Sequence, residues 1–195
     1  QLGAADRIRL HAFAADVPQA TREQVLLEDD AHAVQVVLAR HVEHGVVFVG
    51  QSVRYYGAAI FNSLEGVPME KRIEMPVIED FQMGFCTGLA LAGKVPVCMF
   101  PRIDFMLLAL NQLVNHLDKL PLFGWKPKVI IRTTIGQKTP LDAGPQHTQD
   151  HTEAIRKMLT TVHVMKLEQA EYVGASYAAA LELPQSVLIV ENPCS

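Results

Sequence analysis

The sequence alternates short, continuous apolar runs with longer segments in which apolar residues recur at intervals of three and four. Continuous apolar runs predict buried strands, whereas the three-to-four period predicts helices. The predicted strands are Val46–Val49, Arg72–Met75, Val95–Phe100, Lys128–Arg132, Val162–Lys166 and Ser186–Val190. The predicted helices are Glu79–Ala92, Phe105–Leu120, Thr152–Leu159 and Ala170–Leu183. Because the strand runs do not alternate with polar residues, we expect a doubly wound α/β fold of about six mostly parallel strands, with helices on both faces.

The helix expected over residues 105–120 has a regular apolar face, and the helix before it has a clear end. The apolar residues of that face, which we expect to be buried, are Leu107, Leu110, Val114 and Leu117. Gly93 follows the earlier helix, where a glycine often ends a helix.

The start of the chain differs from the rest. Residues 1–18 have no clear period and are predicted to form a peripheral arm, and residues 19–44 are predicted to form a polar helix. The α/β domain is therefore expected to cover residues 19–195.

Composition narrows the class of protein. The 195 residues are 49% hydrophobic and 19% charged, which suits one domain with a substantial core. A net charge of −4 argues against a nucleic-acid or acidic-membrane partner, which needs a basic face. The longest apolar stretch, residues 83–100, is interpreted as helix, turn and strand rather than a membrane span. Cys86 and Cys98 lie in apolar runs and are expected in the core, and a cytoplasmic location is expected.

Ligands of doubly wound sheets bind at the carboxyl ends of the strands, so three loops are candidates. These loops are residues 75–79, 100–105 and 133–150. Glu79 opens a predicted helix beside Ile78 and Phe81 and is either a helix cap or a partly desolvated acid for proton chemistry. Phe105 is either a core residue or a ring that stacks on a ligand.

The third loop and the helix 105–120 hold further polar candidates. His147 lies in a loop that is either solvated or lines a site; a metal site of His147, Asp150 and His151 is an alternative, without the HExxH glutamate. Asn111, Gln112 and Asn115 form either an exposed face or a polar seam. No P-loop, GxGxxG or nucleophile elbow is present, which argues against nucleotide-triphosphate and serine-hydrolase chemistry.

Several short motifs follow one another in a recognisable order. These segments are Pro76–Glu79, Leu91–Val97, Asp104, Phe105, Ala109, Asn111, Gln112, Asn115, Lys119, Val129–Arg132, Gln146–Gln149, Glu153, Ala154 and Val187–Glu191. Together they resemble the pyrimidine-binding domain of thiamine diphosphate enzymes, in the transketolase-like superfamily. Within that group, the chain looks most like the beta subunit of the decarboxylating component of 2-oxo acid dehydrogenase complexes.

The resemblance implies a role for individual residues. Glu79 matches the glutamate that hydrogen-bonds the ring nitrogen of the cofactor's aminopyrimidine, and Phe105 matches the aromatic residue that packs on it. Pro101 and Ile78 are adjoining residues of the same two loops and are implied cofactor contacts. His147 matches an active-site histidine that serves the substrate carboxylate or acyl transfer. Glu79 and His147 are therefore the expected catalytic residues.

The sequence departs from this pattern in ways that bear on partners. Gly50–Val53 replaces an acidic G-E-[DE]-V, and Ile78 and Thr148 replace serines. No diphosphate-binding G-D-G…N motif is present, so thiamine diphosphate and its Mg²⁺ are expected to be held mainly by a separate alpha-like chain in an α2β2-type assembly. The expected substrate is a 2-oxo acid or a ketose. Two alternative functions stay open: a non-catalytic scaffold subunit, and the C-terminal-half subunit of a split transketolase.

Overall fold

The computed structural model describes residues 45–137 and 142–192. The arm predicted for residues 1–18 and the helix predicted for residues 19–44 lie outside these ranges. No helix in the described part of the chain is both long and apolar enough to cross a membrane.

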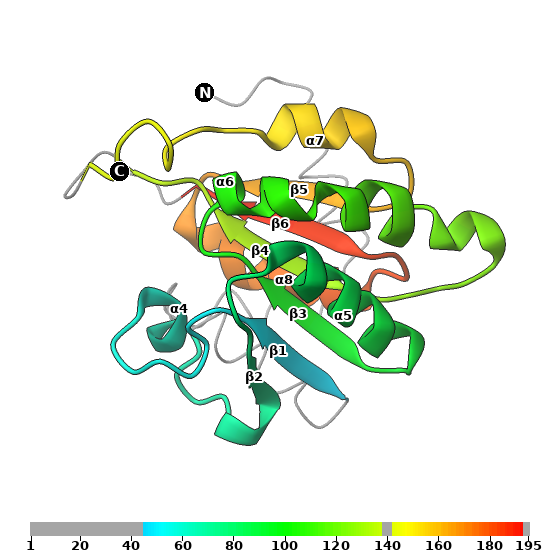
Figure 1. Ribbon diagram of the computed structural model, residues 1–195, viewed down its shortest axis with the longest axis horizontal. Coiled ribbons are helices and arrows are strands. Elements are labelled where there is room, and N and C mark those ends of the chain that lie inside the picture. The colour runs from blue at the N-terminus through cyan, green and yellow to red at the C-terminus, as the bar shows by residue number, and fades with distance from the viewer. Residues whose placement is uncertain (1–44, 138–141, 193–195) are drawn as a thin grey trace.

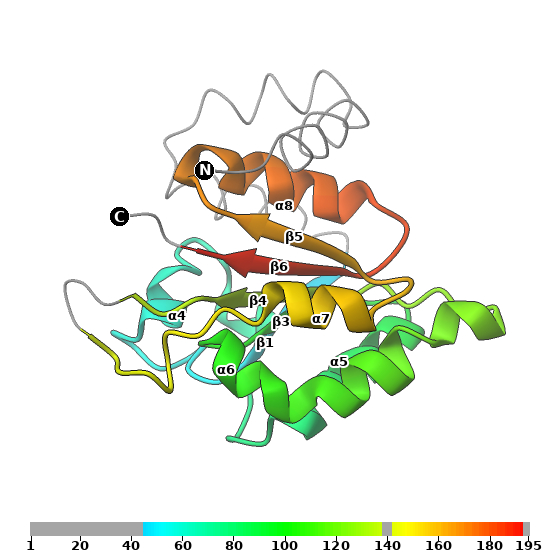
Figure 2. The same ribbon diagram turned by 90° about the horizontal axis from the view of Figure 1, so that it is seen from above.

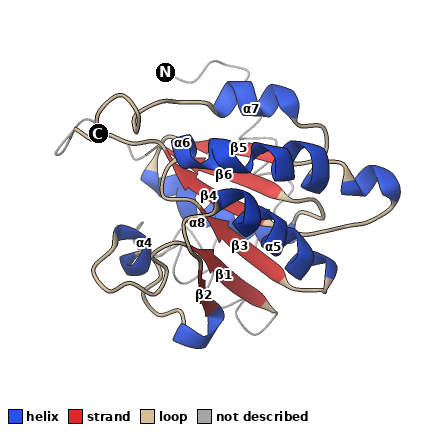
Figure 3. Ribbon diagram, in the orientation of Figure 1, coloured by secondary structure: helices blue, strands red, loops and turns tan. Residues whose placement is uncertain are grey.

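Six strands form one sheet in which every pairing is parallel, which confirms the predicted α/β fold (Figures 1 and 3). The strands lie in the order β2-β1-β3-β4-β6-β5. They are β1 Val46–Gly50, β2 Arg72–Glu74, β3 Val95–Met99, β4 Ile130–Thr134, β5 His163–Leu167 and β6 Val187–Glu191. Because the chain passes from β1 to β2 on one side and from β3 to β4 on the other, the neighbouring loops after β1 and β3 flank a switch in strand order.

Helices cover both faces of the sheet, as the continuous apolar strands require (Figure 2). On one face, α5 (Glu79–Leu91), α6 (Ile103–Met106) and α7 (Thr152–Met158) pack over alternate strand residues such as Val49, Cys98 and Ile131. On the other face, α8 (Val173–Glu182) and the segment around α4 (Ala59–Asn62) pack over Phe48, Val97 and Ile189. Cys86 and Cys98 are buried, as expected.

Helix α5 begins at the predicted residue and ends at Leu91, one residue earlier than predicted, and Gly93 has a positive φ of 82°. The amide of Lys94 then donates to the carbonyl of Leu89, which completes the C-terminal turn. The buried Nε2 of Gln82 donates to the main-chain oxygen of Met99 at 2.9 Å and ties α5 to the end of β3.

The buried face predicted for residues 105–120 is wrong. The helical run begins earlier, at Ile103, and passes through a 3₁₀ turn at Leu107–Ala109 and a π-helical stretch at Gln112–Leu117. Because these changes in residues per turn rotate the buried stripe, only Leu117 of the predicted face is fully buried, Leu110 packs against the core partly buried, and Leu107 is exposed. The buried residues are Ile103, Met106, Ala109, Leu113 and Leu117.

Strand β4 begins two residues later than predicted, because Lys128 has another role. Its ammonium donates hydrogen bonds to the carbonyls of Ala180, Leu183 and Gln185 at the C-terminal end of α8. A cation there complements the helix dipole. Burial lowers the pKa of Lys128 to about 8.

Candidate active site

Glu79 is buried at the carboxyl edge of the sheet, with only 5% of its surface exposed. It is the first residue of α5, and the N-cap position is held by Ile78, which makes no side-chain cap. Its Oε1 accepts a hydrogen bond from Nε2 of Gln51, the residue directly after β1, at 3.1 Å. Within the described residues, Oε2 accepts no hydrogen bond. One carboxylate oxygen is therefore held by the chain, and the other is available to a ligand.

The loop that presents Gln51 is held by Glu74, at the end of β2. Glu74 accepts hydrogen bonds from the amides of Ser52 (2.5 Å) and Arg54 (2.7 Å), one at each carboxylate oxygen. Ser52 has a φ of +62°, a left-handed conformation that costs a residue other than glycine about 1 kcal/mol. Gly50 allows the loop to approach β3, since a β-carbon there would lie 2.6 Å from the Met99 oxygen.

The apolar neighbours of Glu79 do not shield it from water. Val77, Ile78 and Phe81 are 76%, 53% and 55% exposed, so they form an apolar rim beside Glu79 rather than a cover over it. Phe81 stacks on Phe85 with ring centroids 6.1 Å apart, and the patch continues along α5. An exposed apolar rim around a buried carboxylate is typical of a site that another molecule covers.

Phe105 and His147, two of the predicted site residues, lie in contact. Their rings meet edge to face with centroids 5.2 Å apart, and both side chains are half-buried, so Phe105 is not a plain core residue. The Nδ1 atom of His147 is buried without a hydrogen-bond partner in the described residues. Within the same ranges, no hydrogen bond or ring contact joins this pair to Glu79.

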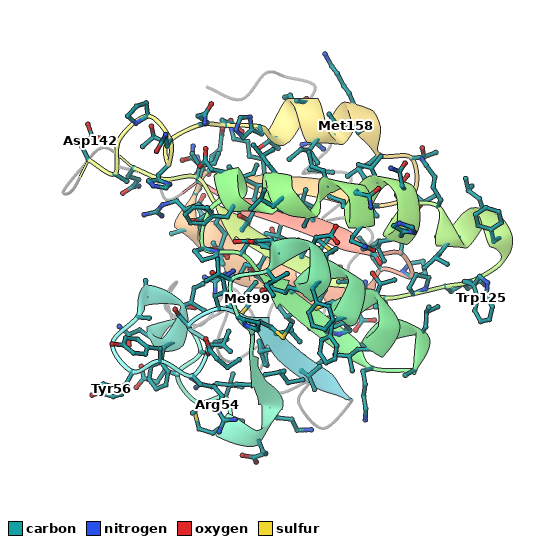
Figure 4. The ribbon with its side chains drawn as sticks, in the orientation of Figure 1. Arg54, Tyr56, Met99, Trp125, Asp142 and Met158 are labelled. Carbon is teal, nitrogen blue, oxygen red and sulfur yellow. The ribbon has the colours of Figure 1, made fainter. Side chains whose placement is uncertain are left out.

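Gly136, after β4, allows the loop with His147 to lie against the sheet edge. A β-carbon at Gly136 would lie 1.8 Å from the main-chain oxygen of His147 and 3.1 Å from Nε of Arg102. Only a glycine leaves room for that oxygen. Figure 4 shows this loop projecting from the molecule beside the label of Asp142.

The remaining polar residues of the two loops are partly paired, and Oδ2 of Asp104 and Nε2 of His151 are buried without a hydrogen-bond partner in the described residues. The Oδ1 atom of Asp104 accepts a hydrogen bond from Nε2 of Gln149 at 3.0 Å and lies 3.7 Å from Nε2 of His151. Asp150 accepts from the amide and hydroxyl of Thr152 at the start of α7. In the part of the chain that the structure describes, no three His, Cys, Asp or Glu side chains group as a metal site, so the alternative with Asp150 has no geometric support.

The amide side chains on the helical run divide between two roles. Gln112 donates to Oδ2 of Asp80 at 3.3 Å and so bridges to α5, whereas Asn115 donates to Asn111 on the exposed surface. Pro101 is half-buried, and its carbonyl accepts from the Thr134 hydroxyl at 2.8 Å, which ties the loop after β3 to β4.

The segments Val129–Arg132 and Val187–Glu191 meet in a partly buried ion pair. Arg132 donates to both carboxylate oxygens of Glu191 at 2.9 and 3.0 Å and to the hydroxyl of Ser63 at 2.6 Å. The Tyr177 hydroxyl donates to the same carboxylate at 2.6 Å, and burial raises the pKa of Tyr177 well above its usual value. Burial alone lowers the pKa of Arg132, but the Glu191 carboxylate outweighs it and the net shift is upward. This network joins β4, β6, α8 and the segment after α4.

Four residues around the site were not identified as candidates from the sequence: Gln51, Glu74, Arg102 and Gly136. Gln51 and Arg102 follow strands, so the strand-end rule could have selected both. Glu74 acts by accepting main-chain amides across 20 or more residues, and Gly136 acts by a close main-chain approach, and neither contact has a signal in the residue pattern.

Comparison with known proteins shows that the chain has the fold of thiamine diphosphate-binding proteins. No protein-family model matches the sequence. The chain is 30% identical over 168 residues to "Pyruvate dehydrogenase E1 component subunit beta, mitochondrial" of Chaetomium thermophilum, which covers 82% of this chain and 43% of that relative. The chain therefore spans less than half the length of the curated relative that it matches.

Two solved structures share the fold. An inactive β4 tetramer of a split-gene transketolase has a TM-score of 0.64 and 20% identity, over 84% of this chain and 50% of the other. Transketolase from Campylobacter jejuni subsp. jejuni NCTC 11168 has a TM-score of 0.61 and 13% identity, over 82% of this chain and 25% of the other. The resemblance to pyrimidine-binding domains of thiamine diphosphate enzymes, in the transketolase-like superfamily, is confirmed.

Proposed function

We propose that this chain is the pyrimidine-binding, beta-like part of a two-component thiamine diphosphate enzyme that acts on a 2-oxo acid or a ketose. In this proposal, a separate alpha-like chain holds the diphosphate and most of the Mg²⁺ coordination, in an α2β2-type assembly. The curated relative is named as a subunit, which supports a partner chain. A cytoplasmic location stays part of the proposal, because that relative is named as mitochondrial.

The observation that carries the proposal is the state of Glu79. Its carboxylate is buried, has one oxygen paired with Gln51 and one without a partner in the described residues, and lies beside an exposed apolar rim. Within the described residues, Oε2 is not among the buried atoms without a partner, so it keeps contact with solvent and can accept a hydrogen bond from a ligand.

The residues present fit the aminopyrimidine half of the cofactor. Phe105 and Ile78 offer apolar contact, Pro101 shapes the loop after β3, and Glu79 offers a hydrogen-bond acceptor.

The chain's own residues would control a proton and orient the substrate. Thiamine diphosphate, when bound, supplies the nucleophilic carbon for attack on a carbonyl. Glu79, through Oε2, would share a proton with the ring nitrogen, while Gln51 holds Oε1 and so sets the direction of Oε2. His147, with an unpartnered Nδ1, would serve the substrate carboxylate or the acyl-transfer step.

Two other functions remain candidates. The similarity to an inactive β4 tetramer of a split-gene transketolase favours, as an alternative, the C-terminal-half subunit of a split transketolase. The second alternative is a non-catalytic scaffold subunit that kept the fold. This function predicts no role for the carboxylate of Glu79.

A pair of neighbouring variants tests the proposal. In the complex with its partner chain, Glu79→Gln keeps the side chain's shape but cannot exchange a proton, so hydrogen–deuterium exchange at the thiazolium carbon should slow by about 10²-fold or more. Asp80→Asn is the control, because it alters the adjacent carboxylate, which accepts a hydrogen bond from Gln112. In this variant, the thiazolium carbon should exchange its proton at the parent rate. If both variants exchange as fast as the parent, the scaffold function is favoured.

A further inference from the structure

Arg102 stands apart from the other arginines of the described ranges. It is half-buried at the carboxyl edge of β3, yet its side chain makes no hydrogen bond or ion pair within those ranges. Of the others, Arg132 binds Glu191, Arg156 binds Glu153 and the Val164 carbonyl, Arg72 binds main-chain carbonyls, and Arg54 is exposed. A partly buried guanidinium loses hydration that no group in these ranges replaces, so it has capacity for an anion.

The main chain holds Arg102 in place. Its carbonyl accepts hydrogen bonds from the amides of Phe105 and Met106 at 3.2 and 3.4 Å, and the preceding carbonyl is bound by Thr134. The nearest acid along the chain, Asp104, pairs through Oδ1 with Gln149, and its buried Oδ2 has no hydrogen-bond partner in the described residues. Asp104 therefore does not bind the guanidinium of Arg102, which lies on a loop held by its main chain.

Arg102 also lies beside the loop that carries His147. Its Nε and the main-chain oxygen of His147 both approach Gly136, at 3.1 and 1.8 Å from the position of a β-carbon. The His147 ring packs on Phe105 and has a buried Nδ1 without a partner in the described part of the chain. A cation, an imidazole and an aromatic ring therefore meet at one edge.

We propose that Arg102 binds an oxyanion group of the substrate: the carboxylate of a 2-oxo acid or the phosphate of a phosphorylated ketose. The inference rests on the proposed function and names the substrate class of that site as anionic. A guanidinium binds carboxylate and phosphate with two parallel, charge-assisted hydrogen bonds, which orient the group as well as hold it. Arg102 thus places the substrate's reacting carbonyl on the His147 side of the site.

The test is a titration of the full-length chain, labelled with ¹⁵N, with pyruvate and separately with inorganic phosphate. The Arg102 Nε–H resonance should move in the millimolar range, and Arg102→Gln should weaken binding at least tenfold, measured through the His147 ring resonances. Arg102→Lys, which keeps the charge and lacks the fork, should retain part of the affinity. Arg54→Gln is the control: this exposed arginine lies far from the loop of Asp142 in Figure 4 and should bind like the parent.

Each outcome decides something. Tighter binding of pyruvate supports the site with a 2-oxo acid, and tighter binding of phosphate supports it with a phosphorylated ketose. Equal binding by the parent and Arg102→Gln, or no movement of the Arg102 resonance with either anion, overturns the inference. Because the titration needs neither cofactor nor partner chain, its result is distinct from failure of the proposed function, which appears as normal proton exchange in Glu79→Gln.

Discussion

One hydrogen bond separates the two interpretations of Glu79 that its sequence context allows. A helix-capping carboxylate would be turned to the amides of its own first turn. Glu79 is turned to the side chain of Gln51, 28 residues away, and the cap position belongs to Ile78. Residue type and order therefore predicted the candidate acid, but its partner comes from a neighbouring strand.

A substitution of His147 tests whether this residue takes part in catalysis. His147→Ala should lower turnover of the assembled enzyme by about 10²-fold, the usual scale for a positioned acid–base group. Cofactor affinity should hardly change, because Glu79 and Phe105 are untouched. Steady-state kinetics and a cofactor titration measure the two quantities.

An exposed histidine provides the matched control. His116 lies on the outer side of the helical run, so His116→Ala should keep the parent turnover. Equal turnover in His147→Ala and His116→Ala would return His147 to a solvated loop without a catalytic role.

At the scale of elements, main-chain geometry arranges the site. The helical run from Ile103 to Leu117 mixes three kinds of turn, which places Phe105 at the sheet edge rather than in the core. Glu74 holds the loop after β1, and Gly136 lets the His147 loop close on the end of β4. These elements bring loops that are distant in sequence to one edge.

A substitution at Gly136 tests the close approach of the His147 loop to the end of β4. Gly136→Ala puts a β-carbon where the His147 carbonyl lies, so the loop must move, at a cost of about 1–3 kcal/mol in unfolding free energy. Turnover should fall with it, because His147 and Arg102 both flank that position. Denaturant melts and kinetics on the same preparation measure both effects.

The comparison variant is Gly88→Ala, on the exposed side of α5, where a β-carbon meets nothing within 4 Å. It should raise the unfolding free energy by about 0.5–1 kcal/mol, as alanine favours a helix interior. A neutral Gly136→Ala beside a stabilised Gly88→Ala would contradict the close approach.

At the scale of the whole molecule, a buried acid ties distant segments together. Asp118 has no exposed surface and accepts hydrogen bonds from the amides of Thr160, Thr161 and Val162, with Lys119 paired at 2.7 Å. Burial by itself raises its pKa, but these hydrogen bonds lower the pKa of Asp118 to about 2. The carboxylate thus joins the end of the helical run to the start of β5.

The lowered pKa of Asp118 makes the free energy of unfolding depend on pH. Because the folded value lies below the unfolded value, Asp118 stabilises the protein above about pH 4, and that contribution is lost as the pH falls toward 2. The shift corresponds to about 2 kcal/mol. Urea melts of the parent and Asp118→Asn should differ by at least that much at pH 7 and converge toward pH 2; a constant difference would exclude this linkage.

The sequence by itself determined the class of this protein. Strand and helix periods reflect which faces are buried, so six parallel strands between helices were predictable, as were the strand-end loops and Glu79, Phe105 and His147 within them. Only the tertiary structure decided which side chains lie in contact: Gln51 with Glu79, Phe105 with His147, and Arg132 with Glu191. It also left the side chain of Arg102 without a partner in the described residues. The reason is physical, because burial patterns are local properties of a segment, whereas hydrogen bonds and close approaches depend on how strands distant in sequence are placed beside one another.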